Sequence, residues 1–161
     1  MAQIKPLAVR RLAEPFEALR AAAEAHAVST ETPSKVFLAC IGDLASYGAR
    51  ATWITNFLAA GGVGAIQSTP LSDAGAIAAA FKDSGATIAC ICGADAAYGD
   101  LGAAAASALK SAGAQRVYLA GRPKDLEAAL QAAGVDAFIF AGADALTTLG
   151  DLHKALGITK S

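Results

Sequence analysis

The strongest constraint on the fold is an alternation that begins at Lys35. Short, continuous apolar runs alternate with longer alanine-rich segments, and four of these segments end at a glycine just before the next run. A continuous apolar run is typical of a strand covered on both faces, and glycine commonly follows the last residue of a helix. We therefore expect five strand–helix units. The expected strands are 35–41, 63–66, 87–92, 116–120 and 136–140, and the expected helices are 47–60, 76–84, 101–112, 125–133 and 144–156.

This alternation predicts an α/β fold with a doubly wound parallel sheet. Right-handed crossovers leave few topologies, and for five strands we expect the flavodoxin-like (Rossmann-like) order 2-1-3-4-5. The binding crevice then lies at the carboxyl ends of the first and third strands, at 42–48 and 93–99. The chain has 43 alanines among 161 residues. Because alanine buries little area, its helices and strands must approach closely.

The first 34 residues form a separate zone. They are charged and helical in pattern and end in a polar stretch, so we predict a helical linker at 1–34 and the α/β domain at 35–161. A net charge of −1 provides no positive electrostatic potential that would attract nucleic acid. The window 53–72 has no charged residue, but glycines and Pro70 interrupt it, so we expect no membrane-spanning helix there. Three cysteines and no export signal predict the cytoplasm of a bacterium, or another reducing compartment.

The residues with reactive side chains favour no catalytic site. His26 and His153 lie in predicted helices away from the crevice, which removes histidine-based catalysis there. Cys90 and Cys92 face the same side of a buried strand and are interpreted as apolar fillers rather than metal ligands. The sequence has no Walker or G-x-G-x-x-G loop, and it lacks the paired carboxylates and lysine of a receiver domain.

The loop from Gly42 to Gly48 is where chemistry would sit. Asp43 is interpreted first as a helix cap, although an orienting role is also open. Tyr47 and Tyr98 lie at the two crevice segments, where we expect them to cover or plug the crevice.

From Pro33 through Gly48 and into the following helix, the chain resembles the cobalamin-binding domain at the C-terminus of methylmalonyl-CoA mutases. The segment from Arg10 to Arg20 (RRLAEPFEALR) is similar to the linker that leads out of the mutase barrel. This resemblance covers nearly the whole chain, but only as the tail of a longer subunit. It implies a family reaction, the radical rearrangement of methylmalonyl-CoA and succinyl-CoA, whose chemistry belongs to adenosylcobalamin.

The resemblance also implies a set of degenerate motif positions. Active members have D-x-H-x-x-G after the first strand, where the histidine ligates cobalt, the aspartate orients it and the glycine leaves room for the nucleotide tail. Here Asp43 and Gly48 match, but Ala45 stands at the ligand position, and Tyr47 adds bulk beside the path of the tail. The S-x-L after the third strand falls near Cys92 and Ala94, and the Gly-Gly after the fourth falls near Ala120 and Gly121.

The motifs after the first, third and fourth strands are all degenerate. Among the mutases that the chain resembles, this points to the small, non-catalytic subunit of a heterodimeric bacterial enzyme. We then expect no catalytic residue, metal or bound cobalamin in this chain, and a catalytic large subunit as the partner that carries adenosylcobalamin. In isolation the domain is expected to form a homo-oligomer. One alternative is a functional mutase domain that binds cobalamin without a histidine ligand, and a weaker one is a flavodoxin-like module for flavin or another small ligand.

Overall fold

The computed structural model describes residues 4–30, 35–121, 123–140 and 145–158. The strands are β1 (Lys35–Cys40), β2 (Gly64–Gln67), β3 (Ile88–Cys92), β4 (Arg116–Ala120) and β5 (Ala137–Ile139). The helices are α1 (Ile4–Thr30), α2 (Leu44–Ala60), α3 (Ala74–Ser84), α4 (Asp95–Ala97), α5 (Ala103–Ser111), α6 (Glu127–Ala133) and α7 (Ala145–Leu156). A π-helical turn, η1 (Tyr98–Gly102), precedes α5, and a 3-10 turn, η2 (Lys124–Leu126), precedes α6.

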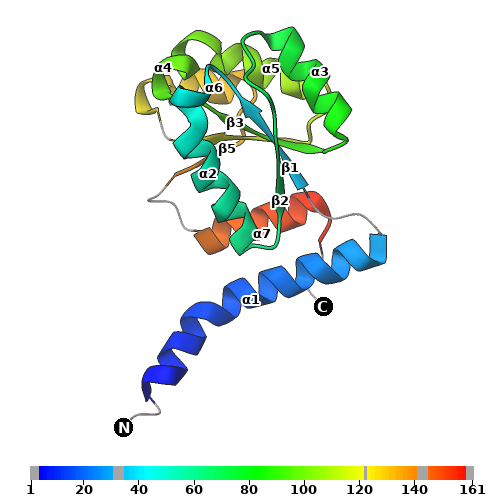
Figure 1. Ribbon diagram of the computed structural model, residues 1–161, viewed down its shortest axis with the longest axis vertical. Coiled ribbons are helices and arrows are strands. Elements are labelled where there is room, and N and C mark those ends of the chain that lie inside the picture. The colour runs from blue at the N-terminus through cyan, green and yellow to red at the C-terminus, as the bar shows by residue number, and fades with distance from the viewer. Residues whose placement is uncertain (1–3, 31–34, 122, 141–144, 159–161) are drawn as a thin grey trace.

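The strands form one parallel sheet in the order β2-β1-β3-β4-β5, so the predicted fold and strand order are confirmed. Alternate strand residues enter two separate cores. Leu38 and Cys40 pack on the face covered by α2 and α7, whereas Phe37 and Ala39 pack on the face covered by α3, α5 and α6. Figure 1 shows these helices on the two sides of the sheet.

The alanines are used for close approach, as the composition predicted. On the α5 side of the sheet, Ala39 and Ala89 of the strands and Ala105 and Ala106 of α5 are fully buried. A methyl group there lets helix backbone lie close to strand backbone, where a larger side chain would hold the layers apart.

Helix α1 packs across the α2–α7 side of the domain. Leu19 and Ala23 are buried, and Arg20 Nη1 donates a hydrogen bond to the carbonyl of Ala60 at 3.3 Å. A Cβ at Gly62 would lie 2.8 Å from the Cβ of Ala23, so glycine is needed at this crossing. Figure 1 shows the N-terminal part of α1 extending past the rest of the molecule. The predicted linker boundary at residue 34 lies outside the described residues.

Three helical segments begin earlier than expected, and α3 does so by two residues, at Ala74. Helix α2 starts at Leu44 rather than Tyr47, because the side chain of Asp43 caps it. The segment after β3 was expected to remain a crevice loop to Gly99, but it is helical from Asp95 onward, first as α4 and then as η1. A Cβ at Gly102 would lie 2.9 Å from Leu130 Cδ2, so tertiary packing against α6 accompanies this irregular turn. Within the described residues, no helix combines the length and apolarity that a membrane crossing requires.

Candidate functional site

The carboxyl end of β1 is built around a helix cap. Asp43 has an extended backbone, and its carboxylate accepts a hydrogen bond from Ser46 N at 2.8 Å. This bond lowers the pKa of Asp43 and satisfies a donor at the first turn of α2. The capping interpretation is therefore confirmed. Ala45 follows on the same turn as an exposed methyl group, which offers no atom that could ligate a metal.

Tyr47 points the other way, into the core between α2 and the sheet. It is 2% exposed, and burial raises its pKa. Along α2, Ala51, Ile54 and Leu58 continue the same buried face. The space between α2 and the sheet is thus filled by side chains of this chain. Gly48 does not contribute to that packing, since a Cβ there would meet Leu44 Cδ1 at an ordinary 3.6 Å.

Tyr98 is buried in the core on the opposite side of the sheet. It is 1% exposed, its hydroxyl accepts a hydrogen bond from Gly93 N at 3.0 Å, and it donates to the carbonyl of Ala120. Burial raises the pKa of Tyr98, so the phenol stays protonated and can donate. The Tyr98 hydroxyl thus ties together the ends of β3 and β4, and the expected covering of the crevice by Tyr98 stays a prediction.

The cysteines lie beneath this region. Cys40 and Cys92 stand opposite each other in the β1–β3 register and are fully buried. A hydrogen bond between them lowers the pKa of Cys40 and raises that of Cys92, while burial raises the pKa of Cys90. All three are free thiols. In the described part of the chain, no group of three or more His, Cys, Asp or Glu side chains could hold a metal ion.

Arg50 reaches from α2 across the carboxyl edge of the sheet. Its Nη1 donates to the carbonyl of Gly93 at 2.7 Å and to Asp95 Oδ1 at 3.1 Å, and its Cζ lies 5.7 Å from the centre of the Tyr98 ring. At Gly121, φ is +117°, and a Cβ would lie 3.2 Å from Arg50 Cζ. Glycine at 121 therefore leaves room for a guanidinium of this chain, which takes up space above the end of β4.

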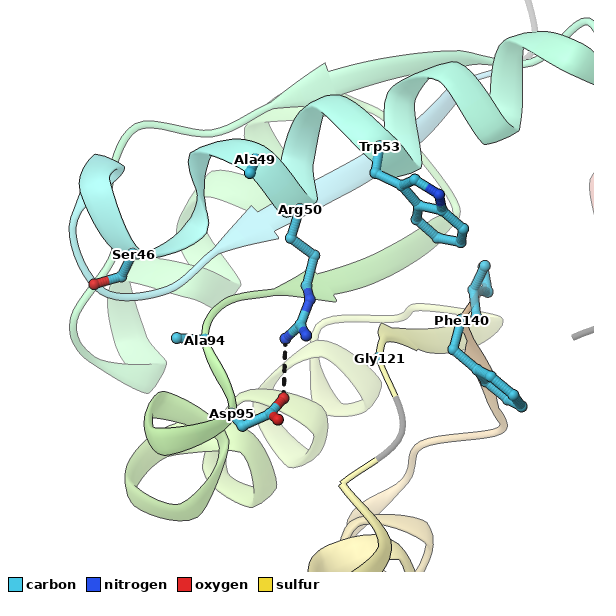
Figure 2. Close-up of a pocket in the computed structure, with 9 residues that line it drawn as sticks. Ser46, Ala49, Arg50, Trp53, Ala94, Asp95, Gly121 and Phe140 are labelled. Carbon is cyan, nitrogen blue, oxygen red and sulfur yellow. Dashed lines mark hydrogen bonds and ion pairs between the residues drawn. The ribbon is translucent and has the colours of Figure 1, made fainter. Parts of the chain in front are cut away.

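A cavity of about 530 Å³ remains at this edge. Ser46, Ala49, Arg50 and Trp53 of α2 form one wall, and the rest comes from the segment after β3 and the ends of β4 and β5. Figure 2 shows Arg50 reaching down toward Asp95, whereas the ring of Phe140 points away from Trp53.

The structure brings together part of the predicted site. Ala94 and Gly121 line the cavity, whereas Asp43 and Ala45 do not. Cys92 is buried. The lining side chains of Trp53, Asp95, Ile139 and Phe140 were not predicted, because contacts between segments so far apart leave no local signal in the sequence.

The histidines lie elsewhere, as predicted. His153 on α7 is 4% exposed, and its Nε2 donates to the carbonyl of Gly61 at 2.7 Å. His26 is half-buried on α1. Neither residue lines the cavity at the carboxyl edge of the sheet.

Comparison with known proteins gives consistent relatives. A methylmalonyl-CoA mutase small subunit from Streptomyces virginiae is 41% identical over 145 residues, which is 90% of this chain and 22% of that protein. A probable methylmalonyl-CoA mutase small subunit from Mycobacterium tuberculosis (strain ATCC 25618 / H37Rv) is 41% identical over 150 residues, 92% of this chain and 24% of that protein. The resemblance to mutase small subunits is confirmed. A methylmalonyl-CoA mutase small subunit from Propionibacterium freudenreichii subsp. shermanii is 34% identical over 161 residues, 97% of this chain and 24% of that protein.

The chain thus spans about a quarter of the length of these mutase small subunits. No protein-family model matches it. Among solved structures, the signal receiver domain of the response regulator NarL from Mycobacterium tuberculosis aligns with 78% of this chain and 98% of its own, at 19% identity and a TM-score of 0.49.

Proposed function

We propose that this chain is a non-catalytic, cobalamin-free structural and interaction domain of a cytoplasmic methylmalonyl-CoA mutase small subunit. The isomerisation of methylmalonyl-CoA and succinyl-CoA then belongs to a catalytic large subunit, the partner that carries adenosylcobalamin. We place the linker at residues 1–34 and the cobalamin-binding-like domain at 35–161.

The observation that carries this proposal is the combination of Ala45 and Tyr47. The position at which the mutase family has its cobalt-ligating histidine carries a methyl group, and two residues later a tyrosine is buried between α2 and the sheet. A group that needs a cobalt ligand at residue 45 and free space at the position of Tyr47 finds neither here. The residues present therefore do not fit cobalamin, and no step of the reaction is assigned to them.

Two further positions support the same conclusion. The guanidinium of Arg50 lies beside Gly121, and the Tyr98 hydroxyl binds the carbonyl of Ala120, so this chain's own side chains occupy the region after β4. Each of these contacts would have to break before a nucleotide tail could enter there. Ala94 and Gly121 line the cavity at this edge, but Arg50 takes up the space beside Gly121.

Titration of the purified chain with hydroxocobalamin, followed by visible absorbance, tests the proposal. We expect no saturable change at micromolar concentrations. A saturable shift to a histidine-ligated spectrum would overturn it. Saturable binding without that shift would instead favour the alternative, a functional mutase domain that binds cobalamin without a histidine ligand.

The interaction role has a separate test. We expect the chain to co-sediment with the catalytic large subunit and, when alone, to show a sedimentation coefficient that rises with concentration. A chain that stays monomeric at high concentration counts against homo-oligomerisation. Failure to co-sediment counts against the proposed partner.

A further inference from the structure

Two cysteines lie directly opposite each other at the carboxyl ends of neighbouring strands. The chain has three cysteines, all within the described residues, and Cys40 of β1 pairs with Cys92 of β3 in the register of the sheet. Both side chains belong to the same core, on the side of the sheet that α2 and α7 cover. Cys90 instead stands opposite Leu38 and Tyr118. The register therefore makes Cys40 and Cys92 a pair.

The geometry of this pair suits a disulfide that forms and breaks easily. Neighbouring strands lie roughly 4.7–4.9 Å apart, and a disulfide spans Cα atoms that are roughly 4.4–6.8 Å apart. The thiols of Cys40 and Cys92 are already hydrogen-bonded to each other, so closing the bond needs only a small approach of the two sulfur atoms. Side chains at the strand spacing stand slightly wider apart than a relaxed disulfide prefers, and strained disulfides are readily reduced.

The thiols differ in how easily they ionise. The hydrogen bond with Cys92 lowers the pKa of Cys40, whereas the same bond, together with burial, raises the pKa of Cys92. Burial also raises the pKa of Cys90. Because the thiolate is the nucleophile in thiol oxidation, Cys40 is suited to attack an oxidant and Cys92 to resolve the product.

The first turn of α2 lies next to the pair. Burial raises the pKa of Tyr47, and the neighbouring Cys40 and Cys92 add to that rise, so the ring is close to both thiols. The two cysteines are inaccessible, but residues 42–46 above them are all exposed, and the side chain of Asp43 caps this turn. A helix end opens more readily than a packed core, and fraying of this turn gives a small oxidant access to the thiols.

From these observations we propose that Cys40 and Cys92 are a site of reversible oxidation, at which hydrogen peroxide converts the two thiols into an intramolecular disulfide. The Cys40 thiolate attacks one peroxide oxygen and becomes a sulfenic acid, and the hydroxide that leaves takes up the proton lost by the thiol. The Cys92 thiol then attacks the sulfenic sulfur, which forms the S–S bond and releases a second water molecule. The two thiols thus supply the two electrons that reduce the peroxide. This site goes beyond the proposed structural role.

Mass spectrometry of the full chain after peroxide treatment tests the proposal. We expect the intact mass to fall by two hydrogen atoms, non-reducing peptide maps to join Cys40 to Cys92, and dithiothreitol to restore the original mass. Cys90→Ala should form the same bond, whereas Cys40→Ala and Cys92→Ala should not lose two hydrogens. Far-ultraviolet circular dichroism establishes that the variants fold. The proposal is overturned if the wild type forms no disulfide, if the bond involves Cys90 or joins two chains, or if Cys92→Ala still loses two hydrogens.

A pair of capping residues tests the route of access. Asp73 caps α3 on the other face of the sheet as Asp43 caps α2, since each carboxylate accepts a backbone N–H at 2.8 Å. Asp43→Ala should form the disulfide about fivefold faster than the wild type, because loss of a cap favours fraying, while Asp73→Ala should leave the rate unchanged. Asp43→Asn keeps a capping side chain without the charge and should oxidise at the wild-type rate. Equal rates in Asp43→Ala and Asp73→Ala would overturn access through α2. The readout is a covalent mass change, so it is independent of whether the chain binds cobalamin.

Discussion

At the scale of single residues, two buried tyrosines differ in what their hydroxyls contact. The Tyr98 hydroxyl bonds to Gly93 N and to the carbonyl of Ala120. The Tyr118 hydroxyl is buried without a hydrogen-bond partner among the described residues. Both rings are nearly inaccessible, at 1% and 2% exposure, so the loss of an oxygen isolates the polar contribution.

We therefore expect Tyr98→Phe to lower the free energy of unfolding by about 1–3 kcal/mol, since two buried backbone groups lose their partner. Tyr118→Phe serves as the matched control and should be neutral or slightly stabilising. The hydroxyl that it removes is desolvated on folding but gains no hydrogen bond in return. Urea unfolding of both variants measures this. Equal losses in the two variants would contradict the assignment of the Tyr98 hydroxyl as a structural link.

The same Tyr118 gives a pH dependence. Burial raises its pKa to about 12, whereas in the unfolded chain a tyrosine ionises near pH 10. Between these values the unfolded state loses the proton and the folded state keeps it, so stability present below about pH 10 is lost as the pH rises through about 12. Relative to Tyr118→Phe, the wild-type free energy of unfolding should fall by about 1 kcal/mol per pH unit in this window. Parallel urea curves at about pH 7 and about pH 11 measure it, and a constant difference between the two proteins would refute it.

At the scale of elements, the crossing of α1 over the end of α2 depends on one glycine. Gly62 has φ of +77°, and a Cβ there would lie 2.8 Å from the Cβ of Ala23 and 2.9 Å from the Cα of Arg20. Gly85 has nearly the same φ, +75°, but a Cβ there would meet nothing within 4 Å. The two positions share the backbone strain and differ in the contact with α1.

Gly85→Ala should therefore cost about 1–2 kcal/mol from the left-handed backbone alone. Gly62→Ala should cost about 1–3 kcal/mol more, because the added methyl group displaces α1. Urea unfolding gives the difference, and hydrogen exchange shows whether the amides of residues 16–30 lose protection only in Gly62→Ala. If both variants lose the same stability and α1 stays protected, α1 does not depend on this contact.

At the scale of the whole molecule, the sequence was sufficient for the layers of the fold but not for the site. Asp73 as a cap, Gly85 as a helix end and the apolar run of β3 are local signals, and each is present in the structure. The cavity instead depends on Arg50, which meets Gly93 and Gly121 through tertiary contacts. No periodicity or spacing encodes such contacts.

The turn that carries Tyr98 was missed for a related reason. The stretch 93–102 contains Gly93, Gly99 and Gly102, which locally indicate a loop. Packing against Leu130 and Ile41 requires small residues at Gly102 and Gly93, where a Cβ would lie 2.9 and 2.6 Å from those side chains. Glycine is therefore present at these two positions because neighbouring side chains pack closely against them. This packing overrides the preference of a glycine-rich stretch for a loop.

The filled crevice also predicts how the whole molecule responds to cobalamin. A ligand that binds only the folded state raises the free energy of unfolding, by about 2.7 kcal/mol at 100 times its dissociation constant. Because Tyr47 fills the space between α2 and the sheet, urea unfolding curves should be the same with and without hydroxocobalamin.

The variant Ala45→His separates the two features that we propose exclude cobalamin. It places an imidazole on the exposed first turn of α2 but leaves Tyr47 and the Arg50–Gly121 contact in place. We expect this variant, like the wild type, to gain no stability from hydroxocobalamin. A gain in Ala45→His alone would mean that the missing ligand was the sole barrier and that the buried tyrosine yields to the nucleotide tail. An unchanged curve would mean that the core, and not just the cobalt ligand, has to change before cobalamin can bind.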